Sequence, residues 1–263
     1  YSEFSYNTLV GAYEPFLDII CNMHRRFIGG SFDDFQKECG VYYLHRQVLN
    51  SYYETGECFR EETVLLNEVA YEQRRMTMAI ADMLKRLSEV RPLMIVINRF
   101  QMASKSSIET IKYLIDNPCA NIGIVLGVNA IVKGADSTVE VWDRIVESLE
   151  DRSAIYYIGS AGPLKNNIKT TNDDELYITM NFEQSIQEAS NIMEFLDFEQ
   201  ARRGCRIIEH KLKFEDAWID EKSLRRFYMV YARTSVLLGE MSKAIELTNE
   251  YKALIPENDS EHY

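Results

Sequence analysis

A short apolar run, Leu93 to Ile97, restricts most strongly how this chain can fold. The run is too short for a helix and lies between Pro92 and polar residues, which favours a strand buried on both of its faces. An amphipathic pattern over Ser106 to Ile115 follows after a short polar loop. Because a buried strand followed by a helix is half of a parallel α/β unit, the sequence predicts a parallel sheet here.

Further apolar runs extend the predicted sheet. Ile122 to Val128 and Ala154 to Ile158 are each separated from the run before by enough residues for a helical crossover. Leu176 to Met180 is a candidate for a last short strand. We therefore expect three adjacent parallel strands, with a fourth strand close to the end of the sheet domain.

Two amphipathic helices are predicted before the sheet. The first follows Pro15, and its apolar positions recur at helical spacing as far as Phe27. The second spans Glu61 to Ser88 and carries one apolar stripe. The part of this stripe that we expect to pack on the sheet consists of Met83, Leu84 and Leu87.

The chain after Met180 is predicted to be entirely helical. The polar stretch Gly159 to Glu175 precedes it, so we expect an α/β domain over residues 1–180 and a helical domain over residues 181–263. Short turns between the helices are typical of stacked helical hairpins. The four predicted helices are Phe182–Phe195, Phe198–Phe214, Leu224–Leu238 and Met241–Leu254.

Composition restricts the partners and the compartment. A net charge of −12 and a pI near 4.9 argue against nucleic acid or an anionic membrane as the main partner, because both bind clustered cations. The five cysteines are widely spaced without a Cys-x-x-Cys pair, which fits a reducing compartment. No apolar stretch approaches the length of a membrane span. We therefore predict a cytoplasmic protein that contacts neither membrane nor nucleic acid directly.

The sequence offers no catalytic constellation. Ser160 lacks the Gly-x-Ser-x-Gly context of a nucleophile, and we interpret the acid pairs Asp33–Asp34 and Asp173–Asp174 as solvated turns. The phosphate-binding pattern Gly-x-x-x-x-Gly-Lys-Ser/Thr does not occur. We therefore expect no catalytic residue, no metal ligand and no cofactor in this chain.

The segment after the first predicted strand resembles the Walker B region of STAND and related AAA-type signalling ATPases. That region has roughly four apolar residues, Asp-Asp, an apolar residue, Gln or His, Trp-Ala-Asp, two residues, then Ser and Leu. Asn98, Arg99 and Ser104 stand here where the pattern has its three acids. The other matching positions are Phe100, Gln101, Met102, Ala103, Ser107 and Ile108. The resemblance implies a P-loop NTPase-like α/β domain that is incomplete in this chain.

The loss of the three acids has a chemical consequence. In such ATPases the first acid holds hydrated Mg²⁺ and the next helps to position the attacking water. Asn98 adds no negative charge, and Arg99 would repel a metal ion. Asn129 stands roughly where the family has a sensor of the γ-phosphate. The resemblance thus implies a degenerate domain, with ATP or ADP as a ligand only of a longer protein; the alternative is that Asn98 and Arg99 belong to an ordinary loop.

The last two predicted helices are similar to a tetratricopeptide repeat, whose helices pack closely because small residues stand at their crossing. The residues at the spacings of the repeat are Tyr228, Ala232, Gly239, Ala244 and Pro256. The preceding helix pair matches less fully. The resemblance implies a protein or peptide partner that binds mainly to the first helix of each pair.

Together, these resemblances imply a regulatory or protein-interaction fragment of a larger cytoplasmic bacterial signalling or transcription-regulatory protein, which is not an enzyme by itself. Two alternatives stay open. One is an active ATPase switch with its phosphate loop before Tyr1 and acids supplied by Asp116, Asp136 or Asp143. The other is a purely structural helical scaffold.

Overall fold

The computed structural model describes residues 11–60, 68–98, 100, 103–127, 181–214 and 219–254, together with the backbone of residues 2–3, 132–133 and 169–170. Several predictions lie outside these residues and are not tested by the structure. They concern the strands Ala154–Ile158 and Leu176–Met180 and the residues Arg99, Asn129 and Pro256.

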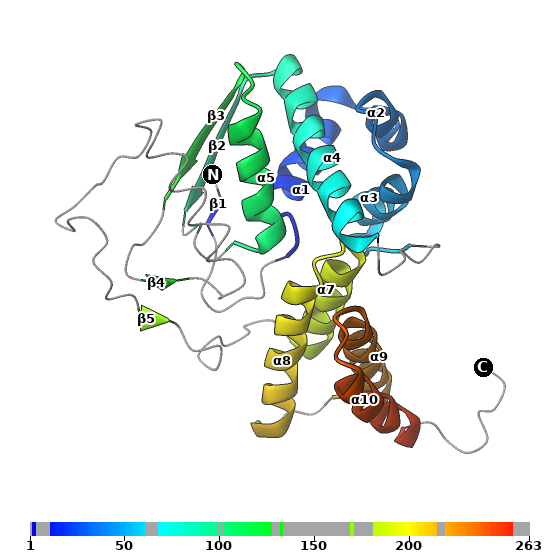
Figure 1. Cartoon of the computed structure of the whole chain (residues 1–263). Coiled ribbons are helices and arrows are strands. Elements are labelled where there is room, and N and C mark those ends of the chain that lie inside the picture. The colour runs from blue at the N-terminus through cyan, green and yellow to red at the C-terminus, as the bar shows by residue number, and fades with distance from the viewer. Residues whose placement is uncertain are drawn as a thin grey trace.

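A small parallel sheet forms at the predicted place. Strand β2 (Leu93–Asn98) pairs in parallel with β3 (Ile122–Leu126), with Leu93 opposite Ile122 and Ile97 opposite Leu126. Helix α5 (Lys105–Asp116) is the crossover between them, and β1 (Ser2–Glu3) pairs in parallel with the end of β2 (Figure 1). The first two predicted strands and the helix between them are therefore confirmed. Two short strands, β4 (Val132–Lys133) and β5 (Lys169–Thr170), pair separately.

The expectation that the first strand is buried on both faces is wrong. Ile95 and Ile97 are buried in the core, but the Met94 side chain is 69% exposed. Val125 of β3, which lies opposite Val96, is 50% exposed on the same face of the sheet as Met94. The described helices thus cover one face of β2 and β3. The apolar run alone could not reveal this difference between the faces.

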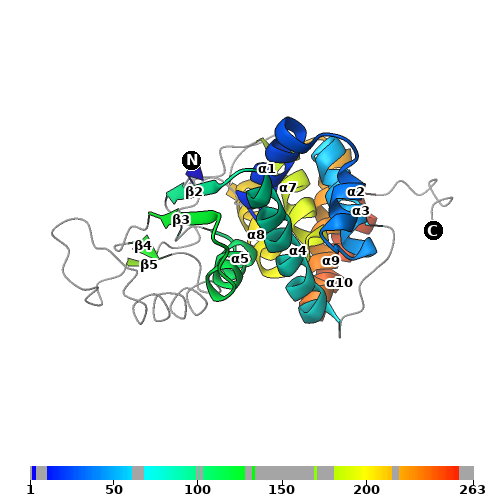
Figure 2. The same ribbon diagram turned by 90° about the horizontal axis from the view of Figure 1, so that it is seen from above.

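Helix α4 (Val69–Val90) is the central helix of the α/β part. It confirms the second predicted helix from Val69 onward and extends it by two residues past Ser88, whereas residues 61–67 are outside the described part. Figure 2 shows α4 between α5 on one side and helices α2 (Phe32–Glu38) and α3 (Tyr43–Thr55) on the other. The predicted stripe of Met83, Leu84 and Leu87 is fully buried in the same core as Ile95 and Ile97.

The helix predicted after Pro15 begins where expected. Helix α1 (Phe16–Met23) follows Pro15 directly and continues as a π-helical turn, η1 (His24–Ile28). The first turn packs its apolar side against α4, because Phe16, Leu17 and Ile20 are buried. The loop before α1 therefore lies close to the core.

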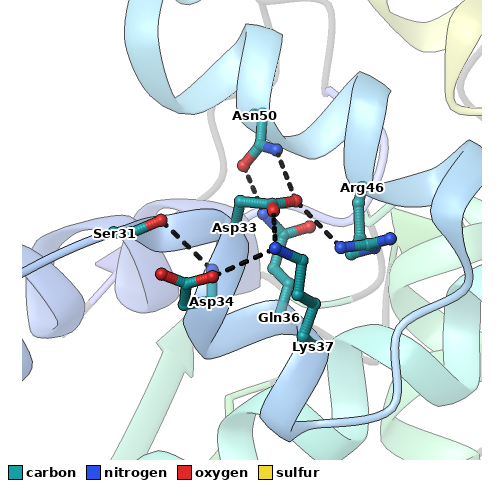
Figure 3. A network of polar contacts seen from close by, with 7 residues as sticks. All are labelled: Ser31, Asp33, Asp34, Gln36, Lys37, Arg46 and Asn50. Carbon is teal, nitrogen blue, oxygen red and sulfur yellow. Dashed lines mark hydrogen bonds and ion pairs between the residues drawn. The ribbon is translucent and has the colours of Figure 1, made fainter.

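Asp33 and Asp34 do not lie in a solvated turn, as the sequence suggested; they form the first turn of α2. The Ser31 hydroxyl caps this helix by accepting the Asp34 N–H at 3.2 Å. Asp33 accepts hydrogen bonds from Arg46 and Asn50 of α3, each at 3.1 Å (Figure 3). Asp33 therefore links α2 to α3, whereas the Asp34 side chain pairs with Lys37 within α2.

Two helical hairpins follow, as predicted. Helices α7 (Phe182–Glu194) and α8 (Phe198–Phe214) pack against each other, as do α9 (Glu221–Leu237) and α10 (Met241–Ala253). Both α7 and α8 also contact α9, so the second hairpin stacks on the first. The described chain is therefore mainly helical, and its three-stranded parallel sheet lies at the end opposite α10 (Figure 1).

The residues assigned to helix packing in the last hairpin differ in their burial. Gly239 connects α9 to α10 with φ of +76°, a conformation that favours glycine. Ala244 is buried between the helices, whereas Ala232 and Tyr228 are only partly buried. The hairpin is confirmed, but its tightest small residue is Ala244 and not Ala232.

Candidate functional site

The α7–α8 turn inserts into the α/β part, and we call this contact the junction. It consists of the turn Phe195–Asp197, the loop Gly11–Pro15 before α1, and the first turn of α5. The Phe195 ring lies edge-on to Tyr13 and to Tyr52 of α3, with centroid distances of 5.9 and 5.7 Å. The turn therefore joins helices that are far apart in the sequence.

Backbone strain is concentrated at the junction. Among the described residues other than glycine, Tyr13 and Leu196 adopt positive φ angles of 59° and 68°. Such conformations each cost about 1 to 3 kcal/mol and persist only where the surroundings hold them. The Gln73 side chain of α4 donates to the Leu196 carbonyl, and the Tyr13 hydroxyl donates to the Gln73 carbonyl at 3.4 Å. These contacts from α4 hold both strained residues.

Asp197 is the central polar residue of the junction. Its side chain is buried and accepts the Ser106 N–H of α5 at 3.2 Å and the Gln200 N–H of α8 at 3.4 Å. One carboxyl group thus lies at two helix N-termini, where the partial positive charge of each helix favours an anion. Burial raises the pKa of Asp197, while its bonds to Ser106 and Gln200 and the charge of Lys105 lower that pKa.

The residues after β2 are engaged in internal contacts. Ser104 is fully buried and caps α5, because its hydroxyl accepts the Ser107 N–H at 3.3 Å. The Ser106 hydroxyl lies 2.9 Å from that of Ser104 and accepts the Tyr13 N–H at 3.1 Å. Serine and aspartate are both good N-caps. The Ser104 position, where the Walker B pattern has an acid, therefore has a structural role in this chain.

Asn98 lies where the ends of β2 and β3 meet. Its Oδ1 is 2.6 Å from the position that a Cβ atom would occupy at Gly127, so a larger residue at Gly127 would require the Asn98 side chain to shift. The Phe100 N–H donates to the Gly127 carbonyl at 3.0 Å, which closes the two strand ends against each other. The structure thus brings Asn98 next to the segment that leads to Asn129, although Asn129 itself is outside the described residues.

A buried ion pair forms a second contact beside the junction. Glu194, the last residue of α7, has its backbone carbonyl bonded to the Arg60 side chain at 3.0 Å and its carboxylate 3.9 Å from Arg60 Nε. Arg233 of α9 donates to the same carboxylate at 2.8 Å. Burial lowers the pKa of Arg60, but Glu194 and Glu72 oppose this effect. Glu194 therefore connects the segment after α3 to both hairpins.

Asn191 adds a third contact. Its side chain accepts the Cys58 N–H and donates to the Gly56 carbonyl, both at 2.9 Å. Because these partners are backbone groups at the end of α3, the bonds place α7 at a fixed distance from that helix. The C-terminal end of α7 is consequently held by the α/β part.

The described residues include neither a metal-binding cluster nor a membrane-spanning helix. Within the described ranges, His, Cys, Asp and Glu side chains form no group of three or more that could hold a metal ion. In the same part of the chain, no helix combines the length and the apolar character needed to span a membrane. The contacts of the junction are structural, because its polar groups bond to one another.

Comparison of the chain with protein-family models, with curated proteins and with solved structures finds no match. The structural observations therefore carry the functional argument alone.

The residues that form the junction were not predicted from the sequence. Asp197 precedes a helix with Gln200 three residues later, which is the spacing of a helix cap and could have indicated that role. Its bond to Ser106 spans 91 residues, and no local pattern signals such a contact. Glu194 gives no signal either, because its partners Arg60 and Arg233 are 134 and 39 residues away in the sequence.

Proposed function

We propose that this chain is a regulatory, protein-interaction module in which an α/β unit without catalytic activity holds a stack of helical hairpins for docking. In this proposal the α/β unit resembles a degenerate nucleotide switch, and the hairpins resemble tetratricopeptide repeats. A conformational change at the ends of β2 and β3 would be transmitted to the hairpins through the junction. The module would act within a larger cytoplasmic signalling or transcription-regulatory protein.

The observation that carries this proposal is the placement of Asp197. Its carboxyl group bonds both to the first turn of α5, the next helix after β2, and to the first turn of α8. A rotation or shift of α5 therefore displaces the start of α8 or breaks a buried hydrogen bond. If α5 has two discrete arrangements, this shared contact would couple the end of the sheet to the hairpins.

The outer hairpin supports a role in protein binding. Large apolar side chains on α9 and α10 are exposed, and they include Met229 at 55% and Ile245 at 64%. Exposed apolar side chains of this size are typical of interaction surfaces when they gather on neighbouring elements. Most of α7, by contrast, is buried against its neighbours. The expected use of the first helix of each pair for docking therefore applies to α9, together with α10, and not to α7.

Nucleotide hydrolysis by this chain is not expected. Asn98, Arg99 and Ser104 bring no negative charge to hold Mg²⁺, and the sequence contains no phosphate loop. A steady-state phosphate-release assay with ATP and Mg²⁺ should give only background turnover, for the parent and for Asn98→Asp alike. Turnover that requires Mg²⁺ and is lost in Asn98→Lys would instead place metal chemistry at the end of β2.

Unfolding of two aspartate variants tests the coupling. Asp220 caps α9 by accepting the Ser223 N–H at 2.9 Å and serves as the matched control for Asp197. We expect the parent and Asp220→Ala to unfold in one cooperative transition in denaturant. Asp197→Ala should show separate transitions for the α/β unit and the hairpins, or a lower dependence on denaturant. One unchanged cooperative transition in Asp197→Ala would contradict the proposal.

A further inference from the structure

Two carboxyl groups meet at the contact between α7 and the loop before α1. Glu14 lies in that loop, and Glu188 lies on α7. Their Oε1 atoms are 2.8 and 2.6 Å from the position that a Cβ atom would occupy at Gly11. Both side chains are partly buried. Gly11 therefore leaves the space in which the two carboxyl groups approach each other.

The groups that surround this pair are mostly acidic or neutral. Asp18 of α1 is the strongest charge acting on Glu14, and Glu14 followed by Asp18 are the strongest on Glu188. From α3, Tyr52 bonds to Asp18, and the thiols of Cys21 on α1 and Cys58 after α3 also face this region. Arg25 on the next turn and Arg60 act on these thiols.

Burial and like charges make ionisation of the pair unfavourable. Burial, followed by the negative charge of Asp18, raises the pKa of Glu14 to about 7, although a bond to the Gly11 backbone opposes this. Burial, followed by the charges of Glu14 and Asp18, raises the pKa of Glu188 to about 7. Two groups this close titrate as a pair, so these values describe the pair more than either residue.

We propose that Glu14 and Glu188 form a proton-dependent contact that holds α7 against the α/β part. When one of the two side chains carries a proton, α7 stays packed against the loop before α1. When both are ionised, the two negative charges repel each other and this packing weakens. The first hairpin is thereby sensitive to pH close to neutrality. This inference concerns the contact between α7 and the loop before α1, and it does not require the proposed docking function.

The sign of the effect follows from linkage. Because the folded protein holds these protons more tightly than the unfolded chain, whose glutamates have a pKa of about 4.5, the stabilisation is complete below pH 4.5. It is lost as the pH rises through about 7. The loss therefore develops between about pH 4.5 and 7, and the pair should change the stability little above that range. Burial lowers the pKa of His45 from 6.5 to about 3, so His45 acts in the opposite direction as the pH falls below 6.5. Because the variants below keep His45, comparing them with the parent between about pH 5 and 8 isolates the carboxyl pair.

The test compares three variants. Glu188→Gln and Glu14→Gln imitate the protonated forms, and Glu183→Gln, an exposed residue of the same helix, is the control. We expect the melting temperature of the parent and of Glu183→Gln to fall, relative to that of the first two variants, as the pH rises from about 5 to 8. Equal pH dependence in all four proteins would overturn the proposal.

A second measurement needs no variant to fold well. Carbon-13 NMR of the glutamate carboxyl groups in the parent should show two resonances that titrate near neutrality, far above the remaining glutamates. Hydrogen exchange of α7 should accelerate over the same pH range by more than the intrinsic pH dependence of exchange. The proposal would be contradicted if every glutamate titrated in the ordinary acidic range. It would also be contradicted if the protection of α7 amides from exchange did not change with pH.

Discussion

The two ends of the helical stack differ in what surrounds them. At the inner end, α7 is buried and its residues Asn191 and Glu194 bond to the segment after α3. At the outer end, α10 packs on α9, while Met241 and Ile245 expose more than half of their side chains. The inner end is joined by specific polar contacts, and the outer end presents apolar surface.

This difference separates the end of the stack that is fixed in place from the end that the proposed function would use for docking. Buried polar contacts fix geometry, because a partner that is lost leaves an unsatisfied group. Exposed apolar side chains do not hold neighbouring elements in place in the isolated chain, and they contribute little to its stability. In the proposed function, buried polar contacts at the inner end would transmit a conformational change from the ends of β2 and β3. The exposed apolar side chains at the outer end would then bind the partner.

The largest effect is expected at the inner end, from Glu194→Gln. The change removes the carboxylate beside the buried Arg60 and leaves Glu72 as its other acidic neighbour, so the loss should approach the cost of a broken buried ion pair, about 3 to 5 kcal/mol. Glu199→Gln on α8 is the control, because Glu199 pairs with Arg202 at the surface, where such pairs contribute about 0 to 1 kcal/mol. Denaturant unfolding measures both. Similar losses in the two variants would remove the contrast between the inner end and the surface.

An intermediate effect is expected inside the outer hairpin. Ala244→Leu should overpack the contact between α9 and α10 and cost about 1 to 3 kcal/mol. Ala232→Leu should cost less, because Ala232 is only partly buried. Thermal unfolding of the two variants compares the positions directly. A larger loss in Ala232→Leu would restore the ranking that the repeat pattern predicts.

The smallest effect is expected on the outer surface. Ile245→Glu and Met229→Glu should each change the free energy of unfolding by less than about 0.5 kcal/mol, as exposed substitutions usually do. Their matched comparison is Ile186→Glu on α7, where the side chain is buried and the loss should be large. Strong destabilisation by either surface variant would mean that these side chains belong to the core of the chain.

Most of the described helices could be predicted from the sequence. Apolar residues at helical spacing located Phe198–Phe214 at the observed ends and Met241–Leu254 within one residue. The same reasoning found β2 and β3, but it could not tell that Met94 is exposed. An apolar run shows that a segment can be buried, while the helices available to cover each face depend on the whole fold.

The site was much harder to predict, because its bonds join residues that are remote in sequence. Ser104 was identified as a position where an acid is replaced, and its observed role is to cap α5. The cap follows from the serine and its distance to Ser107, so sequence could have suggested it. The contact of Asp197 with Ser106 depends on how the hairpin seats on the α/β part. No local pattern encodes that placement.

The central claim is that Asp197 joins the end of the sheet to the hairpins, and hydrogen exchange tests it most directly. In Asp197→Ala, amides in the first turns of both α5 and α8 should lose protection together, because the two helix starts share one carboxyl group. In Asp220→Ala, only the first turn of α9 should change. Loss of protection at α8 with α5 unaffected in Asp197→Ala would show that Asp197 is a helix cap alone and would contradict the account.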